Sequence, residues 1–425
     1  MGPVVGMVGG GQLARMTFQA SISLNIGFRV LAAGPEESAA QVCPAVQFGD
    51  YRDLEDLLSF AAGCDVVTFD HEHVPGPYLA ALEQAGVVLR PSAEALRFAQ
   101  DKLAMRERLT ALGMPCPRYA PVAGLDDVTA FAAGSGWPVV LKAVSGGYDG
   151  RGVWVCDTPE QAAGVLAHGI AVLVEEHVGF ERELAALVAR SPHNQGAAYP
   201  VVQTVQRDGV CREVLAPAPH LPASRAREAE RLALEIAETL GVTGLLAVEL
   251  FETSSGLLVN ELAMRPHNSG HWTIDGARTS QFEQHLRAVL DLPLGAPNAI
   301  APQVVMANVF GGDAPASTGS ASTGSATTGS ATTGSATTGS ATTGSATTGS
   351  ATTGSATTGR DVYSRYTHVM AADPGVNVHL YGKAAHPGRK IGHVTALPDA
   401  ALGGDIDALR ERAGHAARYL GEGKD

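Results

Sequence analysis

Residues 1–100 alternate short apolar, β-branched runs with segments whose apolar residues recur every three or four positions. The short runs are typical of buried strands, and the longer segments of amphipathic helices. Alternating strands and helices predict βαβ units on a parallel sheet. The expected strands are 4–8, 28–32, 66–69 and 87–89, and the expected helices are 12–23, 54–62 and 78–84.

One long helix is expected after this region. Ser92 is a good N-cap residue, and the periodic pattern continues to Leu112, where Gly113 and Pro115 end it. The first domain boundary is therefore placed close to this helix.

The rest of the chain changes from an α/β to an α+β pattern. Between 138 and 263 strands dominate, with helices at 159–167 and 224–240. A helix at 279–290 precedes a small β-rich part with strands at 304–310, 366–371 and 376–381 and a closing helix at 405–420. The expected domains are 1–100, 101–295 and 296–425.

A low-complexity repeat interrupts the third domain. Residues 317–359 contain only Ser, Thr, Gly and Ala and carry no charge. Such a segment cannot offset its ordering entropy by burial, so a flexible insertion is expected. An interaction or glycosylated stalk is the alternative.

Composition narrows the class of protein. A chain of 425 residues suggests two or three cores, and 43 acidic against 30 basic side chains argue against a nucleic-acid partner. Five cysteines without a Cys-x-x-Cys pair favour reduced thiols. The first residues show no export signal or membrane span, so a cytoplasmic protein is expected.

The Gly9-Gly10-Gly11 loop with Ala14 stands between an expected strand and helix. Its amides could cradle an anion, either a substrate or an NAD pyrophosphate. No acid closes the second strand to hold an NAD ribose. An anionic substrate is favoured, and a plain tight turn stays open.

Lys142 lies in an apolar run, 138–144, that is suited to a buried strand. A buried ammonium needs an anionic partner, although an exposed edge strand would also accommodate it. Four glycines follow within 145–152 and could let a hairpin loop lie close over phosphates. A plain hairpin is the alternative.

A strand at 172–178 ends in polar residues, Glu175 among them. Its backbone could meet an adenine edge, with Glu183 near the ribose hydroxyls. Solvated acids at a strand end fit the spacing equally well.

Two glutamates give the sharpest prediction. A hairpin centred on residue 255 pairs Glu249 with Glu261 and Phe251 with Val259. Opposed carboxylates repel unless a cation lies between them, and Mg²⁺ suits one or two carboxylates plus phosphate oxygens. A register slip or a shared proton is the alternative.

Two cationic or polar loops follow. His267 and His271 are four apart, as in a helical metal site, but Pro266 and Gly270 oppose a helix, so polar substrate contacts fit better. Arg389 and Lys390 could reach a phosphate or form a solvated face.

Taken together, these motifs resemble the 5-(carboxyamino)imidazole ribonucleotide synthetases, a family of ATP-grasp enzymes. Gly-Gly-Tyr-Asp-Gly-Arg-Gly at 146–152 and His-Asn-Ser-Gly-His-Trp at 267–272 are the most specific segments. The resemblance spans the chain apart from the repeat. The other matching segments are 10–16, 260–263, 280–283 and 387–393.

This resemblance implies an N-terminal parallel-sheet pre-ATP-grasp domain, a central ATP-grasp domain and a small β-rich C-terminal domain. It implies ATP and Mg²⁺ as cofactors, bicarbonate and 5-aminoimidazole ribonucleotide as substrates, and a homodimer. The implied reaction carboxylates the exocyclic amine through carboxyphosphate and gives ADP and phosphate.

The resemblance also implies roles for individual residues. The implied nucleotide-binding residues are Lys102, Lys142, Gly147, Tyr148, Asp149, Gly150, Arg151, Gly152, Val153, Glu175, Glu176, His177, Val178, Glu183, Gln206, Asn260 and Glu261. The implied ribonucleotide-binding residues are Gln12, Glu72, Tyr148, His267, Arg389 and Lys390. The implied catalytic residues are Asp149, Arg151, Arg265, His267 and Lys390, and the implied Mg²⁺ ligands are Glu249 and Glu261.

Departures from the family pattern affect fine contacts. His73, Met264 and Gln206 replace the residues usual there. The nearest alternatives are a formate-dependent glycinamide ribonucleotide transformylase and a biotin carboxylase-like enzyme. A nicotinamide-dependent oxidoreductase would leave the paired glutamates unexplained, and a non-catalytic binding protein would leave both them and Lys142 unexplained.

Overall fold

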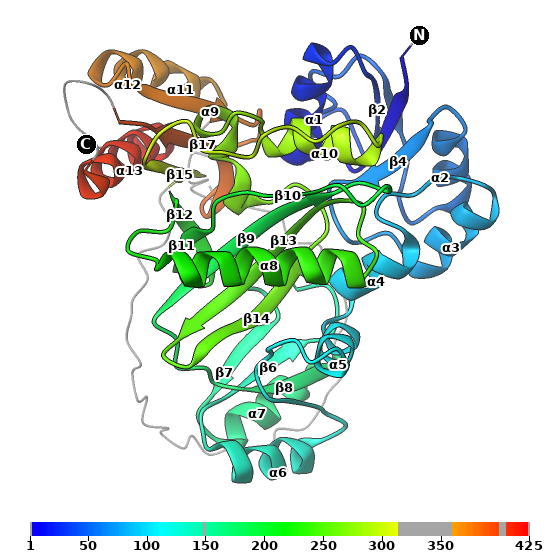
Figure 1. Cartoon of the computed structure of the whole chain (residues 1–425), viewed down its shortest axis with the longest axis vertical. Coiled ribbons are helices and arrows are strands. Elements are labelled where there is room, and N and C mark those ends of the chain that lie inside the picture. Colours follow the sequence, from blue (N-terminus) through cyan, green and yellow to red (C-terminus); the bar gives the residue numbers. More distant parts are fainter. Residues whose placement is uncertain (1, 148–149, 313–358, 399–404, 424–425) are drawn as a thin grey trace, which may run out of the picture.

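The computed structural model describes residues 2–147, 150–312, 359–398 and 405–423. Nearly all of the repeat at 317–359, and Tyr148 and Asp149, lie outside these residues. The described strands form one sheet of nine strands and two of four (Figure 1). These sheets and their helices confirm the expected α/β and α+β architecture. None of the described helices is both long enough and apolar enough to cross a membrane.

The N-terminal sheet is parallel, as the alternating pattern predicted. Its order is β3-β2-β1-β4, and its central side chains, such as Val5, Met7 and Val30, are fully buried. The expected strand at 87–89 is reduced to a bridge between Val67 and Leu89. The elements are β1 (Val4–Val8), α1 (Gln12–Ser23), β2 (Gly27–Ala32), β3 (Val46–Phe48), α2 (Leu54–Ala61), β4 (Val66–Phe69) and α3 (Gly76–Gln84).

The single helix expected from Ser92 to Leu112 is wrong, because the structure has two helices there. They are α4 (Ala93–Gln100) and α5 (Lys102–Ala111). Asp101 between them has an extended backbone, and its carboxylate accepts a 2.8 Å hydrogen bond from the Ala104 amide. An Asp that caps a following helix competes with continuing the preceding one. The break places Lys102 at the start of α5.

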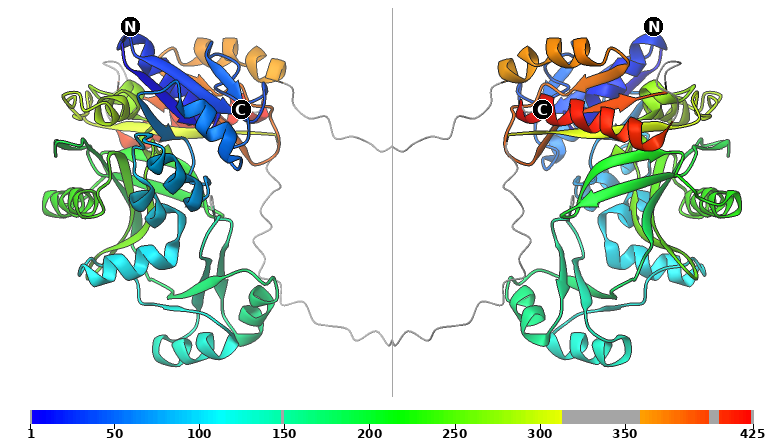
Figure 2. Two further views of the ribbon diagram at one scale, coloured as in Figure 1. Left: turned by 90° about the vertical axis from the view of Figure 1, so that its right-hand side faces the viewer. Right: turned by 90° about the vertical axis from the view of Figure 1, so that its left-hand side faces the viewer.

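A four-stranded antiparallel sheet forms a separate lobe, which projects away from both ends of the chain (Figure 2). Its order is β5-β8-β6-β7, so β6, which carries Lys142, is interior and not an edge. Two helices cover one face of this sheet. The elements are β5 (Tyr119–Pro121), α6 (Leu125–Ser135), β6 (Val139–Ala143), β7 (Val153–Cys156), α7 (Pro159–Leu166) and β8 (Val172–Glu176).

The largest sheet is central and has the order β14-β13-β9-β11-β12-β15-β17-β16, with β10 beside β9. β12 pairs with β15, so the C-terminal strands continue the central sheet. The boundary at 295 therefore falls within one sheet, and the three domain ranges stay a prediction. The strands are β9 (Arg182–Arg190), β10 (Gly196–Ala198), β11 (Val202–Arg207), β12 (Val210–Ala216), β13 (Gly244–Thr253), β14 (Gly256–Ala263), β15 (Val304–Gly311), β16 (Val376–Leu380) and β17 (Arg389–Ala396).

Helices pack on both faces of the central sheet. α8 lies across β9 and β13, α10 lies beside α1, and α13 packs on β15 and β17 (Figure 1). The helices of this part are α8 (Ala223–Thr239), the 3₁₀ turn η1 (Asn268–Gly270), α9 (Thr273–Gly276), α10 (Gln281–Val289), α11 (Gly359–Ser364), α12 (Tyr366–Ala372) and α13 (Ile406–Glu422).

The strand expected at 366–371 is wrong, because this segment forms α12. Its β-branched and aromatic residues favour a strand in isolation. However, Val362, Tyr366 and Val369 recur at helical spacing and join one apolar cluster with α13. Packing against α13 therefore overrides local propensity.

We predict that Asp101→Ala lowers the free energy of unfolding by about 1 kcal/mol, because α5 loses its N-cap acceptor. Urea denaturation measures the change. Asp101→Asn keeps an acceptor oxygen and should retain most of the stability. Equal stability of wild type and Asp101→Ala would contradict the capping role.

Candidate active site

A cavity of about 1430 Å³ opens between the three sheets. Its walls contain residues from the Gln12 loop, the β4–α3 connection, the lobe around β6 and β8, and the central sheet. Every described residue with an implied nucleotide-binding, ribonucleotide-binding, catalytic or Mg²⁺-binding role lines this cavity except Gly152, whereas Gly9, Gly10 and Gly11 do not line it. Tyr148 and Asp149 lie outside the described residues. The structure thus brings the proposed nucleotide and substrate residues together.

A buried cluster of charges forms one wall. Lys142 Nζ lies 2.8 Å from Glu175 Oε2, so the anionic partner expected for Lys142 is Glu175. Arg106 Nε lies 2.7 Å from the other oxygen of the same carboxylate. The exposed fractions of Arg106, Lys142 and Glu175 are 0%, 7% and 2%, so water screens these contacts little.

The charges of this cluster set each other's pKa. Burial alone would raise the pKa of Glu175, but Lys142 and Arg106 hold it below its ordinary value. Burial lowers the pKa of Lys142, and Glu175 opposes that shift. The sequence does not indicate that Arg106 is buried, because the helix segment around it is largely polar. Its guanidinium also donates to the Val259 and Asn260 carbonyl oxygens at 2.9 and 2.7 Å.

Glu249 and Glu261 are paired across β13 and β14, as the hairpin arithmetic predicted. The predicted partner of Phe251 is wrong. A bulge after Glu249 pairs Leu250 with Val259, and Phe251 faces Leu258. Asn260 is the extra residue in β14.

The bulge changes which side chains reach the cavity. Val259 turns into the core, where its exposed fraction is 0%, and Asn260 lines the cavity beside Glu261. Lys142 Nζ then donates a 2.9 Å hydrogen bond to Asn260 Oδ1. A one-residue bulge that re-aims side chains beside a site is a recurrent device in sheets.

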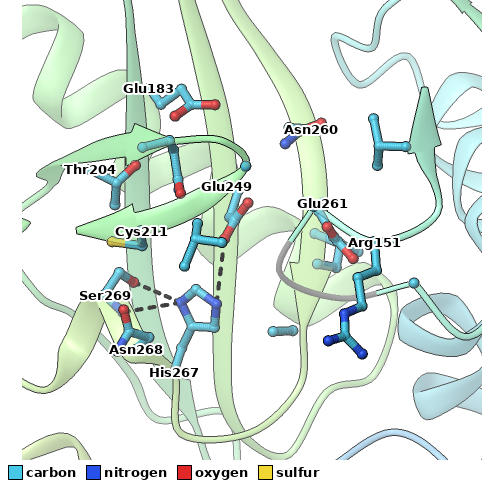
Figure 3. Close-up of a pocket in the computed structure, with 18 of the residues that line it drawn as sticks. Arg151, Glu183, Thr204, Cys211, Glu249, Asn260, Glu261, His267, Asn268 and Ser269 are labelled. Atoms are coloured by element: carbon cyan, nitrogen blue, oxygen red, sulfur yellow. Dashed lines mark hydrogen bonds and ion pairs between the residues drawn. The ribbon is translucent and has the colours of Figure 1, made fainter. Parts of the chain in front are cut away.

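The opposed carboxylates have the expected electrostatic consequence (Figure 3). Burial raises the pKa of Glu249 to about 7, and the charges of Glu261 and Glu183 add to the shift. Lys102 Nζ donates to Glu261 Oε1. Within the described ranges no group of three or more His, Cys, Asp or Glu gathers as a metal site. Two carboxylates beside an open cavity suit Mg²⁺, which takes its remaining ligands from phosphate and water.

A second polar cluster lies next to this pair. Burial, and then Arg265 and Lys390, lower the pKa of His267 to about 3, so its ring is neutral. Its Nε2 lies 3.4 Å from Glu249 Oε1. Arg265 Nε donates to Glu72 Oε2 at 2.9 Å, which joins the central sheet to the N-terminal domain.

The two histidines of the 267–271 segment have different surroundings. His267 caps η1, a single 3₁₀ turn, and not an α-helix. The His271 side chain is 1% exposed, and Gln281 Nε2 lies 2.9 Å from its Nδ1. The expectation that this segment is not an α-helix is confirmed, and its polar contacts with substrate stay a prediction.

The glycine loop at Gly9 binds a carboxylate of the protein itself. The Gly11 amide donates a 2.6 Å hydrogen bond to Asp70 Oδ2. Burial raises the pKa of Asp70 to about 6, and the Gly11 bond opposes that shift. The Gly11 amide therefore binds the protein's own Asp70 carboxylate, and an anionic substrate at this loop stays a prediction.

Lys383 was missed by sequence reasoning. It lines the cavity and donates to Gln12 Oε1 from the loop before β17. Lys383 follows the expected strand at 376–381 in a Gly-Lys-Ala-Ala segment that reads as an ordinary turn, so only the tertiary fold identifies this lysine.

Family models agree with this arrangement. The ATP-grasp domain model matches residues 107–282, and the ribonucleotide synthetase preATP-grasp domain model matches 3–100. The phosphoribosylaminoimidazole carboxylase C-terminal domain model matches 351–402. The fold and the cavity therefore define an ATP-grasp enzyme, an ADP-forming ligase.

Relatives identify the family within that class. N5-carboxyaminoimidazole ribonucleotide synthase from Mycobacterium tuberculosis is 52% identical over 427 residues, which cover 99% of this chain and 89% of that protein. The chain therefore belongs to the N5-carboxyaminoimidazole ribonucleotide synthase family, as its motifs indicated.

Solved structures share the fold over the whole chain. N5-carboxyaminoimidazole ribonucleotide synthetase from Thermus thermophilus has 34% identity and a TM-score of 0.78, with 99% of both chains covered. The synthase from Aspergillus clavatus, in complex with ADP and 5-aminoimidazole ribonucleotide, has 27% identity and a TM-score of 0.80. That match covers 99% of this chain and 98% of the other.

We predict that Arg106→Met lowers the free energy of unfolding by about 3–5 kcal/mol, because it removes one of the two cations around a buried carboxylate. The matched control is Arg118→Met, which breaks the Arg118–Glu176 pair, in which the arginine is exposed and the glutamate half-buried, and should cost less than about 1 kcal/mol. Urea denaturation compares the two. Equal losses would contradict the importance of burial.

A pH dependence follows from Glu249 in metal-free protein. Its folded pKa is raised to about 7, so the folded state binds the proton more tightly than the unfolded state does. This contribution to stability is complete below the unfolded pKa, about 4.3, and is lost as pH rises towards 7.

Glu249→Gln has no carboxyl group that titrates at this position, so the variant does not lose this stability as pH rises. We therefore predict that, in EDTA, the variant gains stability relative to wild type between about pH 4 and 7, by roughly 3 kcal/mol at pH 7. Urea denaturation across this pH range gives the two curves. If the free energies of unfolding of wild type and variant change in parallel across this pH range, the folded protein does not raise the pKa of Glu249.

Proposed function

We propose that the chain carboxylates the exocyclic amine of 5-aminoimidazole ribonucleotide with bicarbonate and ATP. The products are N5-carboxyaminoimidazole ribonucleotide, ADP and phosphate, and the reaction is a step of purine biosynthesis. The observation that carries the proposal is one continuous cavity with opposed carboxylates beside lysines, and an Arg265–His267 cluster adjacent to them. The complex of the Aspergillus clavatus relative with ADP and 5-aminoimidazole ribonucleotide supports it.

The nucleotide end of the cavity is the part near Lys102, Lys142 and Glu261. The lysines attract the phosphates, and the glycine loop after β6 can approach them without side chains. Glu249 and Glu261 would hold Mg²⁺, which would neutralise charge that develops on the transferred phosphoryl group. The 175–178 segment and Glu183 would contact adenosine.

The carboxylation end is the part near Arg265, His267 and Lys390. Bicarbonate attacks the γ-phosphoryl group, ADP leaves, and carboxyphosphate forms. The amine then takes the carboxyl group, and phosphate is released. Arg265 and Lys390 supply positive charge for the anionic intermediate, and the neutral His267 offers a hydrogen bond without repelling these cations.

The proposal includes a cytoplasmic homodimer. No disulfide joins the cysteines of the described residues, which suits a reducing compartment. The dimer rests on family resemblance.

Phosphate release tests the reaction. With ATP, Mg²⁺ and bicarbonate we predict slow release that rises strongly when 5-aminoimidazole ribonucleotide is added. Formate in place of bicarbonate, or glycinamide ribonucleotide in place of the aminoimidazole, should not support the rise. Release that follows either substitute would indicate a different ATP-grasp ligase.

Glu261→Gln serves as the loss-of-function variant in the same assay. It should lower turnover by about a hundredfold or more, because a ligand for the metal and a partner of Lys102 are lost together. Unchanged circular dichroism would show that the fold is intact. Wild-type turnover would remove Glu261 from the metal site.

A further inference from the structure

The His267 ring is held in one orientation by Ser269. Ser269 Oγ lies 2.8 Å from His267 Nδ1, and the Ser269 backbone amide donates to the same nitrogen at 3.4 Å. A backbone N–H can only donate, so Nδ1 accepts and the ring proton is on Nε2. That N–H bond faces Glu249 and the cavity (Figure 3).

The His267 backbone is held separately, by Gln281. The His267 amide donates to Gln281 Oε1 at 2.8 Å, and Gln281 Nε2 donates to the His267 carbonyl oxygen at 2.8 Å. The second amide proton of Gln281 has His271 Nδ1 at 2.9 Å. Because the carbonyl can only accept, the orientation of the Gln281 side chain is fixed.

Gln281 is itself rigidly placed. Its exposed fraction is 0%, and its backbone amide donates to Thr273 Oγ1 at 2.8 Å. A Cβ atom on Gly270 would lie 2.5 Å from Gln281 Oε1, so a glycine is needed opposite the amide. Gln281 does not line the cavity, so any effect on chemistry must pass through the cavity residues that it holds, His267 by two hydrogen bonds and His271 by one.

We propose that Gln281 is a positioning residue for the carboxylation step. It fixes the backbone of His267, while Ser269 fixes the ring, so that the Nε2–H bond points into the cavity beside Glu249. This inference rests on the proposed function, in which His267 contacts the reacting ribonucleotide. A displacement of about 1 Å at such a group can cost about a hundredfold in rate.

The same helix provides a matched control. Gln284 is also fully buried, and its amide forms the same reciprocal pair with Gly295. Gln284 Nε2 donates to the Gly295 carbonyl at 2.8 Å, and the Gly295 amide donates to Gln284 Oε1 at 2.7 Å. Neither residue lines the cavity. Gln284 therefore forms the same kind of reciprocal hydrogen-bond pair, but with Gly295 and not with His267.

The test compares Gln281→Met with Gln284→Met in the full chain. We expect both to lower Tm by similar amounts. Only Gln281→Met should lower kcat for ribonucleotide-dependent phosphate release, by about tenfold or more, with an unchanged Kd for ATP. Equal loss of kcat in both variants, or wild-type kcat in Gln281→Met, would overturn the inference.

Ser269→Ala provides a second variant if Gln281→Met does not fold. Loss of one hydrogen bond to Nδ1 should lower kcat by about three- to tenfold at unchanged Kd for ATP. Wild-type kcat in this variant would count against the ring-orienting role.

A measurement without turnover separates this inference from the proposed function. In ¹⁵N-histidine NMR, the signals lost in His267→Asn should show a protonated Nε2 and an unprotonated Nδ1. The reverse tautomer would refute the positioning even in an active enzyme. Absence of ribonucleotide-dependent release by wild type would instead refute the proposed function.

Discussion

At Asn260 strand β14 contributes one residue more than its partner β13, and the charged side chains at the nucleotide end of the cavity are arranged around this bulge. The bulge turns Val259 into the core and leaves Asn260 and Glu261 together at the cavity. Asn260 accepts from Lys142, whose other partner, Glu175, is shared with Arg106. Arg106 in turn donates to the Val259 and Asn260 carbonyl oxygens, so this series of contacts begins and ends at the bulge.

The surroundings of Glu175 and of Glu249 differ in their electrostatics. Around Glu175 two buried cations, Lys142 and Arg106, share one carboxylate and hold its pKa below the ordinary value. Around Glu249 burial and the facing carboxylate of Glu261 raise the pKa to about 7. A cation between the two carboxylates would offset their repulsion, which is why we propose that Mg²⁺ binds here together with the nucleotide phosphates.

The sequence predicted those features that depend on local spacing. The parallel N-terminal sheet and the Glu249–Glu261 pair follow from strand patterns and hairpin arithmetic. The bulge shifts the register by one residue, and the alternation of apolar positions in the sequence does not indicate it. Arg106 was missed because burial of an arginine depends on distant partners. The helix at 366–372 was missed because its packing partner, α13, lies far along the chain.

The central claim is that Glu249 and Glu261 jointly bind a divalent cation at the nucleotide phosphates. Anomalous diffraction from a crystal grown with Mn²⁺ and a non-hydrolysable ATP analogue tests it most directly. The account predicts a manganese peak coordinated by oxygens of both carboxylates and by the phosphates. A peak bound elsewhere, or carboxylates that turn away from an ordered nucleotide, would contradict it.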